Sequence, residues 1–225
     1  NTKADATFDI KGQKFIKRPD DFKFDISLYM NDFEKKVQEI DVTKGELKRD
    51  IVDYDELSEL KPGEIKDLEK FIKATHTLGL EIIEQPLLVG KENELASIDP
   101  HYRSILVADE SLKNSKSAIN FTPSPQPFGI FNIKLMKCGG LLAAQEIATI
   151  AKAGDIDLFW GCNDESIVSI TAALHIAFAS ANTKYLDLDG SLDLAEDIVT
   201  GGFILKDGLM SISDKPGLGI ELMPR

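Results

Sequence analysis

Short apolar runs that favour β-strands recur along this chain, and each run ends in polar or charged residues. Seven such runs cover residues 22–26, 50–53, 80–84, 104–109, 128–134, 156–161 and 184–189. Their polar ends fall near residues 25, 53, 84, 109, 134, 160 and 187, so successive ends are 25 to 31 residues apart. This is the spacing of a strand followed by a helix, repeated along the chain.

The segments between these runs have the pattern of helices. Residues 61–79 start with a Lys-Pro pair, end at a glycine and carry an apolar stripe that includes Ile65, Leu68 and Ile72. Proline near the start and glycine at the end are the usual boundaries of a helix. Two further segments are apolar and rich in alanine, as helices packed against a sheet tend to be, at 141–154 and 166–181.

An eighth apolar run, at residues 6–10, precedes the other seven. Eight similar units predict an α/β fold of the TIM type, a (β/α)7β barrel of parallel strands that takes up residues 1–225 as a single domain. The first crossover, 11–21, is unusually short, because a parallel connection needs about a dozen residues or more. Either residues 1–21 form an irregular or truncated first unit, or the run at 6–10 is not a barrel strand.

The negative charge of the chain argues against a nucleic-acid or membrane partner. With a formal net charge of -12 and a pI near 4.7, the chain would repel phosphate groups and anionic lipid headgroups. We therefore expect a small-molecule substrate, no nucleic-acid or membrane partner, and leave a homo-oligomer open. No apolar run approaches the roughly 20 residues of a membrane span, and the first residues have no signal-peptide core, so we expect a cytoplasmic protein with reduced cysteines.

Charged residues stand at the ends of consecutive predicted strands. Asp53, Glu84 and Asp109 end three of them, and Lys134 ends the next. In a parallel barrel these ends converge on one mouth, where three carboxylates would repel one another unless a cation lies between them. Hard oxygen ligands favour Mg²⁺ or Mn²⁺ over zinc. The alternative is that each acid merely caps the helix that follows it.

Four motifs follow one another at this strand spacing. They are IEQPL (83–87), VADES (107–111), NIKLMKCGG (132–140) and YLDLDGSLDLAEDIVTGG (185–202). They resemble the fourth, fifth, sixth and eighth strands of enolase-superfamily enzymes of the muconate-lactonizing subgroup. The last motif is most similar to that of dipeptide epimerases of the L-Ala-D/L-Glu type.

The resemblance implies a role for each strand-end residue. It makes Asp53, Glu84 and Asp109 the ligands of Mg²⁺, and Lys134 an acid/base that removes a proton α to a carboxylate. In a cationic, partly desolvated mouth we expect the pKa of Lys134 to be lowered. Lys-or-His bases working with Mg²⁺ are the general pattern of this superfamily. We expect Lys137 to point away from the strand end.

The resemblance also assigns the two acids of the last predicted strand. Asp187 and Asp189 alternate along it and so share one face, and the resemblance implies that they bind the α-ammonium group of the substrate. The alternative is a solvated turn at the strand end. Glu165, in the loop after the preceding strand, is a weaker candidate near the substrate.

Three features depart from the family pattern. Where the second strand usually carries Lys-x-Lys, the chain reads Lys23-Phe24-Asp25, which keeps Lys23 and places Asp25 where the second base belongs. In the third-strand motif Asp55 is an alternative ligand to Asp53. We expect the N-terminal capping domain of these enzymes to be absent from residues 1–225, either because they are a fragment or because sequence is missing before residue 1 or within the first crossover.

The sequence therefore predicts an isomerase that epimerises a dipeptide or N-substituted amino acid through a metal-stabilised enediolate. The alternatives are a cycloisomerase or dehydratase-like lyase on the same barrel, which needs one base only, and a truncated barrel without turnover. Without the capping domain we expect weak or no activity from this chain alone.

Overall fold

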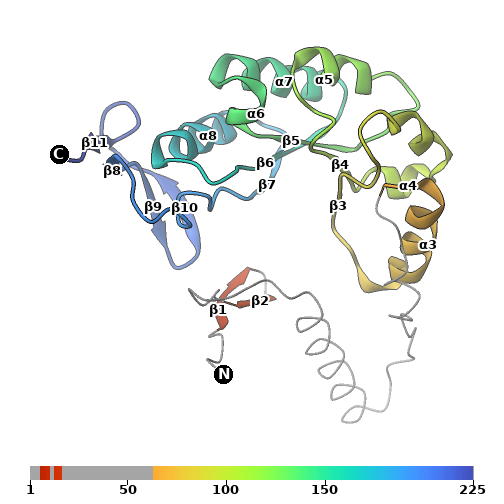
Figure 1. Ribbon diagram of the computed structural model, residues 1–225, viewed down its shortest axis with the longest axis horizontal. Coiled ribbons are helices and arrows are strands. Elements are labelled where there is room, and N and C mark those ends of the chain that lie inside the picture. Colours follow the sequence, from red (N-terminus) through yellow and green to blue (C-terminus); the bar gives the residue numbers. More distant parts are fainter. Residues whose placement is uncertain (1–5, 11–12, 17–62, 225) are drawn as a thin grey trace, which may run out of the picture. The chain divides into compact units, whose positions relative to one another are not determined.

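The computed structural model describes residues 6–10, 13–16 and 63–224 (Figure 1). By its internal contacts the chain divides into two units, residues 1–51 with 206–209 and residues 52–205 with 210–225. Each unit is described by itself. The candidate site lies in the second unit.

A parallel five-stranded sheet is the centre of the second unit, with the strand order β3-β4-β5-β6-β7. Neighbours in the sheet are also neighbours in sequence, as in a chain of βα units. The strands are β3 Ile83–Glu84, β4 Leu106–Ala108, β5 Ile130–Ile133, β6 Asp157–Trp160 and β7 Thr183–Leu186. Five of the seven predicted runs are thus confirmed as parallel strands in the predicted order.

Helices cover one face of this sheet. Figure 1 shows α5, α7 and α8 along the same side of the strands. The α-helices are α3 Ile65–Thr75, α4 Pro100–Arg103, α5 Ser115–Phe121, α6 Leu135–Cys138, α7 Leu141–Ala153 and α8 Ile167–Ala179, and the two 3-10 helices are η1 His76–Leu78 and η2 Glu92–Ser97. The predicted helices within 61–79, 141–154 and 166–181 are confirmed as α3, α7 and α8.

Local sequence fixes several helix ends. Gly79, predicted as a stop, has φ of 68° just after η1, in the left-handed region where glycine meets no steric penalty. At the start of α5, the Asn114 side chain accepts a hydrogen bond from the Ser117 amide, and the Ser117 hydroxyl oxygen accepts one from the Asn114 amide. This reciprocal capping satisfies backbone donors that the first helical turn leaves free.

Alternate residues of the strands face two different layers. Ala108, Phe131, Ile133, Leu158 and Trp160 belong to the large core that the helices share. A second, smaller cluster lies on the other face, where Val107, Ile130 and Phe159 are buried and Ile82 and Tyr185 pack against them. Strands buried on both faces are characteristic of parallel sheets, and this burial requires apolar side chains at successive positions.

The run at 6–10 differs from the prediction. It forms β1 Ala6–Ile10, which pairs antiparallel with β2 Gln13–Ile16. Only two residues separate the strands, a connection that suits a hairpin and is far too short for a parallel crossover. Part of the stretch expected to be a short crossover is therefore a strand, which favours the alternative that 6–10 is not a barrel strand. The predicted strands at 22–26 and 50–53 lie outside the described residues.

Two small sheets follow the parallel one. In one, β8 Val199–Gly201 pairs antiparallel with β11 Ile220–Leu222. In the other, β9 Phe203–Lys206 pairs with β10 Leu209–Ile212. Among the residues that the structure describes, no helix has the length and apolar character that crossing a bilayer requires.

Candidate active site

The smaller core layer sets the direction of the site residues. Its members are Ile82, Val107, Ile130, Phe159 and Tyr185, one from each strand segment of the sheet. Because side chains alternate along a strand, residues two positions further on point to the same face. Those positions are Glu84, Asp109, Asn132, Gly161 and Asp187. The polar residues at the strand ends therefore lie on the same face of the sheet as this small apolar cluster.

Glu84 ends β3, and one of its oxygens is held from β5. Asn132 Nδ2 donates a hydrogen bond to Glu84 Oε1 at 2.5 Å. Although the residue as a whole is exposed, partial burial of its carboxyl group raises the pKa of Glu84, and the negative charge of Asp109 acts in the same direction. The Asn132 bond and the charge of Lys134 oppose this rise without cancelling it. Glu84 is therefore an acid that a nearby cation would stabilise.

Asp109 follows β4 and is bound by two lysines. Lys134 Nζ donates to Asp109 Oδ2 at 2.8 Å, and Lys137 Nζ donates to Oδ1 and, at 2.6 Å, to the backbone oxygen of Asp109. Asp109 is only 6% exposed. Burial acts to raise its pKa, but the hydrogen bonds and charges of the two lysines outweigh burial and hold the pKa of Asp109 below its ordinary value.

The two lysines differ from what the sequence led us to expect. Burial acts to lower the pKa of Lys134, but its bond to Asp109 and the charges of Asp109 and Glu84 raise it overall. The lowered pKa was expected for a mouth that holds a cation, whereas here the acids next to Lys134 stabilise its charged form. Lys137 does not point away, as its contacts with Asp109 show, and its burial lowers its pKa.

Gln85 joins the ends of β3 and β4. Its Oε1 accepts hydrogen bonds from the amides of Asp109 and Ser111 at 3.0 and 3.1 Å. Its Nε2 donates to the Ser111 hydroxyl and to the Leu87 oxygen, both at 2.8 Å. The IEQPL and VADES motifs are therefore parts of one hydrogen-bonded unit that fixes the backbone at Asp109.

The two acids after β7 flank a buried leucine. Leu188 is buried while Asp187 and Asp189 are exposed, so the alternation of the strand continues beyond its last residue. Partial burial and the charge of Asp189 raise the pKa of Asp187, and the charge of Lys134 opposes the rise. Cys162 Sγ holds this loop, since it donates to the Asp187 oxygen at 3.2 Å and accepts from the Gly190 amide at 3.3 Å.

Glu165, the weaker candidate near the substrate, is buried in the loop after β6. It is 4% exposed, and its carboxylate accepts hydrogen bonds from the Asn163 amide and the Ser169 hydroxyl. Both oxygens are used within its own loop and helix α8. Asp187 and Asp189, in contrast, are exposed.

The donor set fits a hard divalent cation. Glu84 and Asp109 supply carboxylate oxygens, the ligands that Mg²⁺ prefers. Asp53, the third proposed ligand, and the catalytic candidate Lys23 lie outside the described residues. Within the described part of the chain, no three His, Cys, Asp or Glu side chains group in a way that would hold a metal ion. The site there consists of two acids with two lysines and Asn132 around them.

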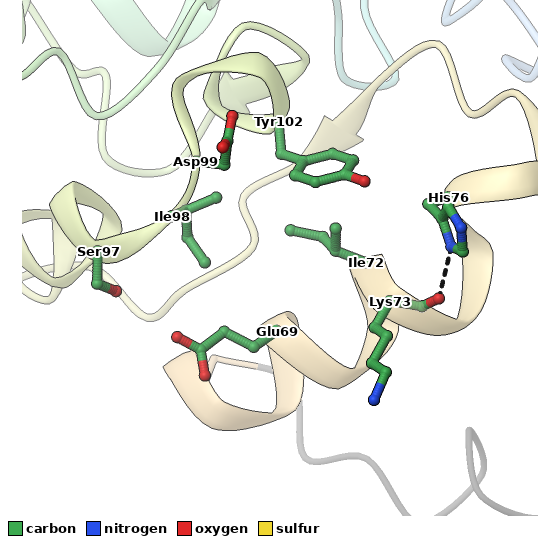
Figure 2. A pocket seen from close by; sticks show the side chains of 8 residues that line it. All are labelled: Glu69, Ile72, Lys73, His76, Ser97, Ile98, Asp99 and Tyr102. Carbon is green, nitrogen blue, oxygen red and sulfur yellow. Dashed lines mark hydrogen bonds between the residues drawn. The ribbon is translucent and has the colours of Figure 1, made fainter.

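A hollow of about 360 Å³ lies elsewhere in this unit, between α3 and the segment that leads into α4 (Figure 2). Its lining includes Ile72, Ile98 and Tyr102 with charged residues around them, and no strand-end acid or lysine. Figure 2 shows His76 at its edge, hydrogen-bonded to the Lys73 oxygen. We therefore place the chemistry at the strand ends and not in this hollow.

A family profile described as "Enolase C-terminal domain-like" matches residues 64–225. The chain belongs to this family. The enolase-type resemblance seen in its motifs is thereby confirmed, and the matched region contains Glu84, Asp109, Lys134, Asp187 and Asp189 but not Asp53. The enolase-like domain accounts for most of this chain.

Known relatives of this enolase-like domain include dipeptide epimerases. The L-Lys-D/L-Arg epimerase of Desulforapulum autotrophicum is 53% identical over 158 residues, which are 70% of this chain and 44% of the relative. The hydrophobic dipeptide epimerase of Enterococcus faecalis is 32% identical over 188 residues, 81% of this chain and 53% of the relative. This chain thus spans about half the length of these curated relatives.

Solved structures give the same result. A dipeptide epimerase from Methylococcus capsulatus complexed with Mg and the dipeptide L-Arg-D-Lys has a TM-score of 0.68 and 49% identity, covering 70% of this chain and 44% of that one. The same enzyme complexed with Mg ion has a TM-score of 0.69 and 48% identity, over 71% and 46% of the two chains. The fold of the matched region is therefore similar to that of these two structures.

Proposed function

We propose that this chain is the barrel portion of a Mg²⁺-dependent dipeptide epimerase. The observation that carries the proposal is the contact of Lys134 Nζ with Asp109 Oδ2, beside Glu84 on the neighbouring strand. Removal of a proton α to a carboxylate needs a base and a positive charge that stabilises the resulting anion. Lys134 would be the base, and the two carboxylates would bind the cation that provides the charge.

Each residue then has one task. Glu84, Asp109 and, as third ligand, Asp53 would hold the cation, which would supply positive charge to offset the negative charge that develops when the α-proton is removed. Lys134 moves the proton on one face of the α-carbon, and Lys23 is the candidate for the opposite face. We further propose that the parallel sheet belongs to a TIM-type (β/α)7β barrel.

The substrate that we propose is a dipeptide with cationic side chains. Two relatives that are 53% identical are L-Lys-D/L-Arg epimerases, and a related solved structure holds L-Arg-D-Lys. The net charge of -12 and the exposed Asp187 and Asp189 favour a cationic ligand. We assign Asp187 and Asp189 to the α-ammonium group of this substrate.

Exchange of the substrate α-proton with solvent tests the proposal. L-Lys-L-Arg is incubated in deuterated water with Mg²⁺ and the protein, and deuterium at the α-carbon is measured by mass spectrometry. We expect incorporation by the parent, and a loss of 100-fold or more on Lys134→Ala, an estimate of the order of general acid–base contributions. Lys152→Ala, at an exposed position of α7, is the control and should leave the rate unchanged. Equal rates in the parent and Lys134→Ala would contradict the proposal.

A further inference from the structure

Asn132 lies among the charged residues of the site but is itself neutral. It is on β5, two residues before Lys134, and only 2% exposed. A buried amide is costly unless it is hydrogen-bonded, and a buried strand position would otherwise favour an apolar residue. Among the described residues, its single side-chain hydrogen bond is the donation to Glu84 Oε1. The Asn132 amide therefore acts as a hydrogen-bond donor to the Glu84 carboxylate.

The neighbouring strand leaves room for this amide. A Cβ atom at Gly161, just after β6, would lie 2.4 Å from Asn132 Oδ1 and 2.9 Å from Nδ2. Real Cβ atoms do not approach other atoms so closely, so any larger residue would push the amide out of its place. Position 161 therefore requires glycine, because a side chain there would overlap the Asn132 amide.

The backbone of Asn132 is tied to the other acid. Lys137 Nζ donates to the Asn132 backbone oxygen at 3.1 Å as well as to Asp109 Oδ1 and the Asp109 backbone oxygen. These three acceptors use all three N–H groups of the ammonium. Lys137 is on α6, which begins directly after Lys134, so one helical turn carries it back to the strand ends.

The contacts fix one side of each acid and leave another side open. Within the described residues, Glu84 accepts a hydrogen bond only at Oε1, so Oε2 is unoccupied by protein donors. Asp109 accepts one side-chain bond from each lysine, and a carboxylate has about four acceptor positions. Both acids thus keep lone pairs for a further ligand while their orientation is set.

We propose that Asn132 and Lys137 are positioning residues for the metal carboxylates, with Asn132 orienting Glu84, Lys137 orienting Asp109, and Gly161 making space for the amide. This inference rests on the magnesium site of the proposed function. Neither residue touches the substrate in this assignment. A neutral donor at 132 orients Glu84 without adding a third ammonium group to those of Lys134 and Lys137.

The test is Mg²⁺ binding to the protein, measured by titration calorimetry in the absence of substrate. Asn132→Leu removes the donor at similar size, and Lys137→Met removes the ammonium. We expect each to weaken Mg²⁺ binding by about 10- to 100-fold, the usual effect of losing a residue that orients a metal ligand. Lys137→Arg keeps N–H donors and should recover part of the affinity. Gly161→Ala should weaken binding as Asn132→Leu does.

Matched controls separate positioning from general stability. Asn182 donates through its side chain to the Ile156 oxygen at 2.8 Å, and Lys184 pairs with Asp157 at 3.2 Å, both on residues outside the site. Asn182→Leu and Lys184→Met should keep the parent affinity even where they lower the melting temperature. If Asn132→Leu does not fold, Asn132→Ala removes the donor without added bulk and takes its place.

The outcomes distinguish the two proposals. Parent binding that Glu84→Gln abolishes, together with unchanged affinity in the Asn132 and Lys137 variants, would overturn the positioning roles alone. No Mg²⁺ binding by the parent would overturn the metal site and these roles with it. Weaker Mg²⁺ binding in both variants, with the parent affinity kept in both controls, would establish the positioning roles.

Discussion

Gln85 Oε1 accepts a hydrogen bond from the backbone amide of Asp109 at 3.0 Å. The two residues end neighbouring strands and are 24 positions apart in sequence. Gln85 also has a φ of 39°, a left-handed conformation that is unfavourable for a residue with a side chain. Its hydrogen bonds to Asp109, Ser111 and Leu87 offset that cost.

Removing the Gln85 amide should therefore destabilise the protein. Gln85→Leu leaves the Asp109 and Ser111 amides without their acceptor, and we expect the free energy of unfolding to fall by about 2 kcal/mol. Urea denaturation measures the loss. Gln145→Leu, at an exposed position of α7, is the control, and an equal effect of the two substitutions would contradict the assigned role of Gln85.

The stability of the protein should depend on pH through Asp109. Its pKa is below the ordinary value of 3.8, so the folded state favours the charged form. This contribution is fully present above pH 3.8 and is lost as the pH falls through the lower folded value. Asp109→Asn should destabilise the protein at pH 7 by about 3 kcal/mol, because it leaves two lysine charges uncompensated. The variant should also lose less stability than the parent between pH 4 and pH 2, measured by urea denaturation; parallel pH curves would exclude this cause.

Ionisation of Glu84 should affect the stability of the folded state in the opposite direction to ionisation of Asp109. Its pKa is above the ordinary value of 4.5, so its ionisation above that pH disfavours the folded state in the absence of a cation. Mg²⁺ at about 100 times its dissociation constant should stabilise the parent by about 2.7 kcal/mol. Glu84→Gln should lose this gain and, with EDTA, melt no lower than the parent. Equal Mg²⁺-induced shifts of the melting temperature in both proteins would remove Glu84 from the metal site.

Cys162 should react slowly with thiol reagents. Burial and the charges of Asp189 and Asp187 raise its pKa to about 11. At pH 8 its thiolate fraction is then about 100-fold below that of a thiol with the ordinary pKa of 9.0. In a Cys138→Ala background, the rate of iodoacetamide labelling should keep rising until about pH 11. A plateau near pH 9 would show that the loop after β7 does not enclose the thiol.

Gly190 should not tolerate a side chain. A Cβ atom there would lie 1.9 Å from the Asn163 oxygen and 3.1 Å from Cys162 Sγ. Gly190→Ala has to move the loop that carries Asp187 and Asp189, and we expect a loss of about 1 to 3 kcal/mol in the free energy of unfolding. Urea denaturation checks this, and an unchanged midpoint would mean that the loop shifts without cost.

The sequence predicted the parts of the fold that follow from local pattern. The runs that became β4, β5 and β6 are mostly apolar at successive positions, and burial on both faces of a parallel sheet requires that pattern. The regular spacing of the runs that became β3 to β7 gave the order of the strands, and their polar ends gave Glu84, Asp109 and Lys134. The run at 6–10 was less certain, because a strand in a hairpin and a strand in a barrel have the same local pattern.

Tertiary structure decided which groups meet, and how they affect one another. Lys137 was expected to point away, but α6 begins at Leu135, and its first turn returns Lys137 to Asp109. The direction of the Lys134 pKa depends on its distance from Asp109 and Glu84, which lie on other strands. Asn132 gave no signal of its own, because its role depends on Glu84 and on the space at Gly161. Periodicity along one chain fixes elements and the faces of strands, whereas charge interactions and steric fit depend on distances between residues far apart in sequence.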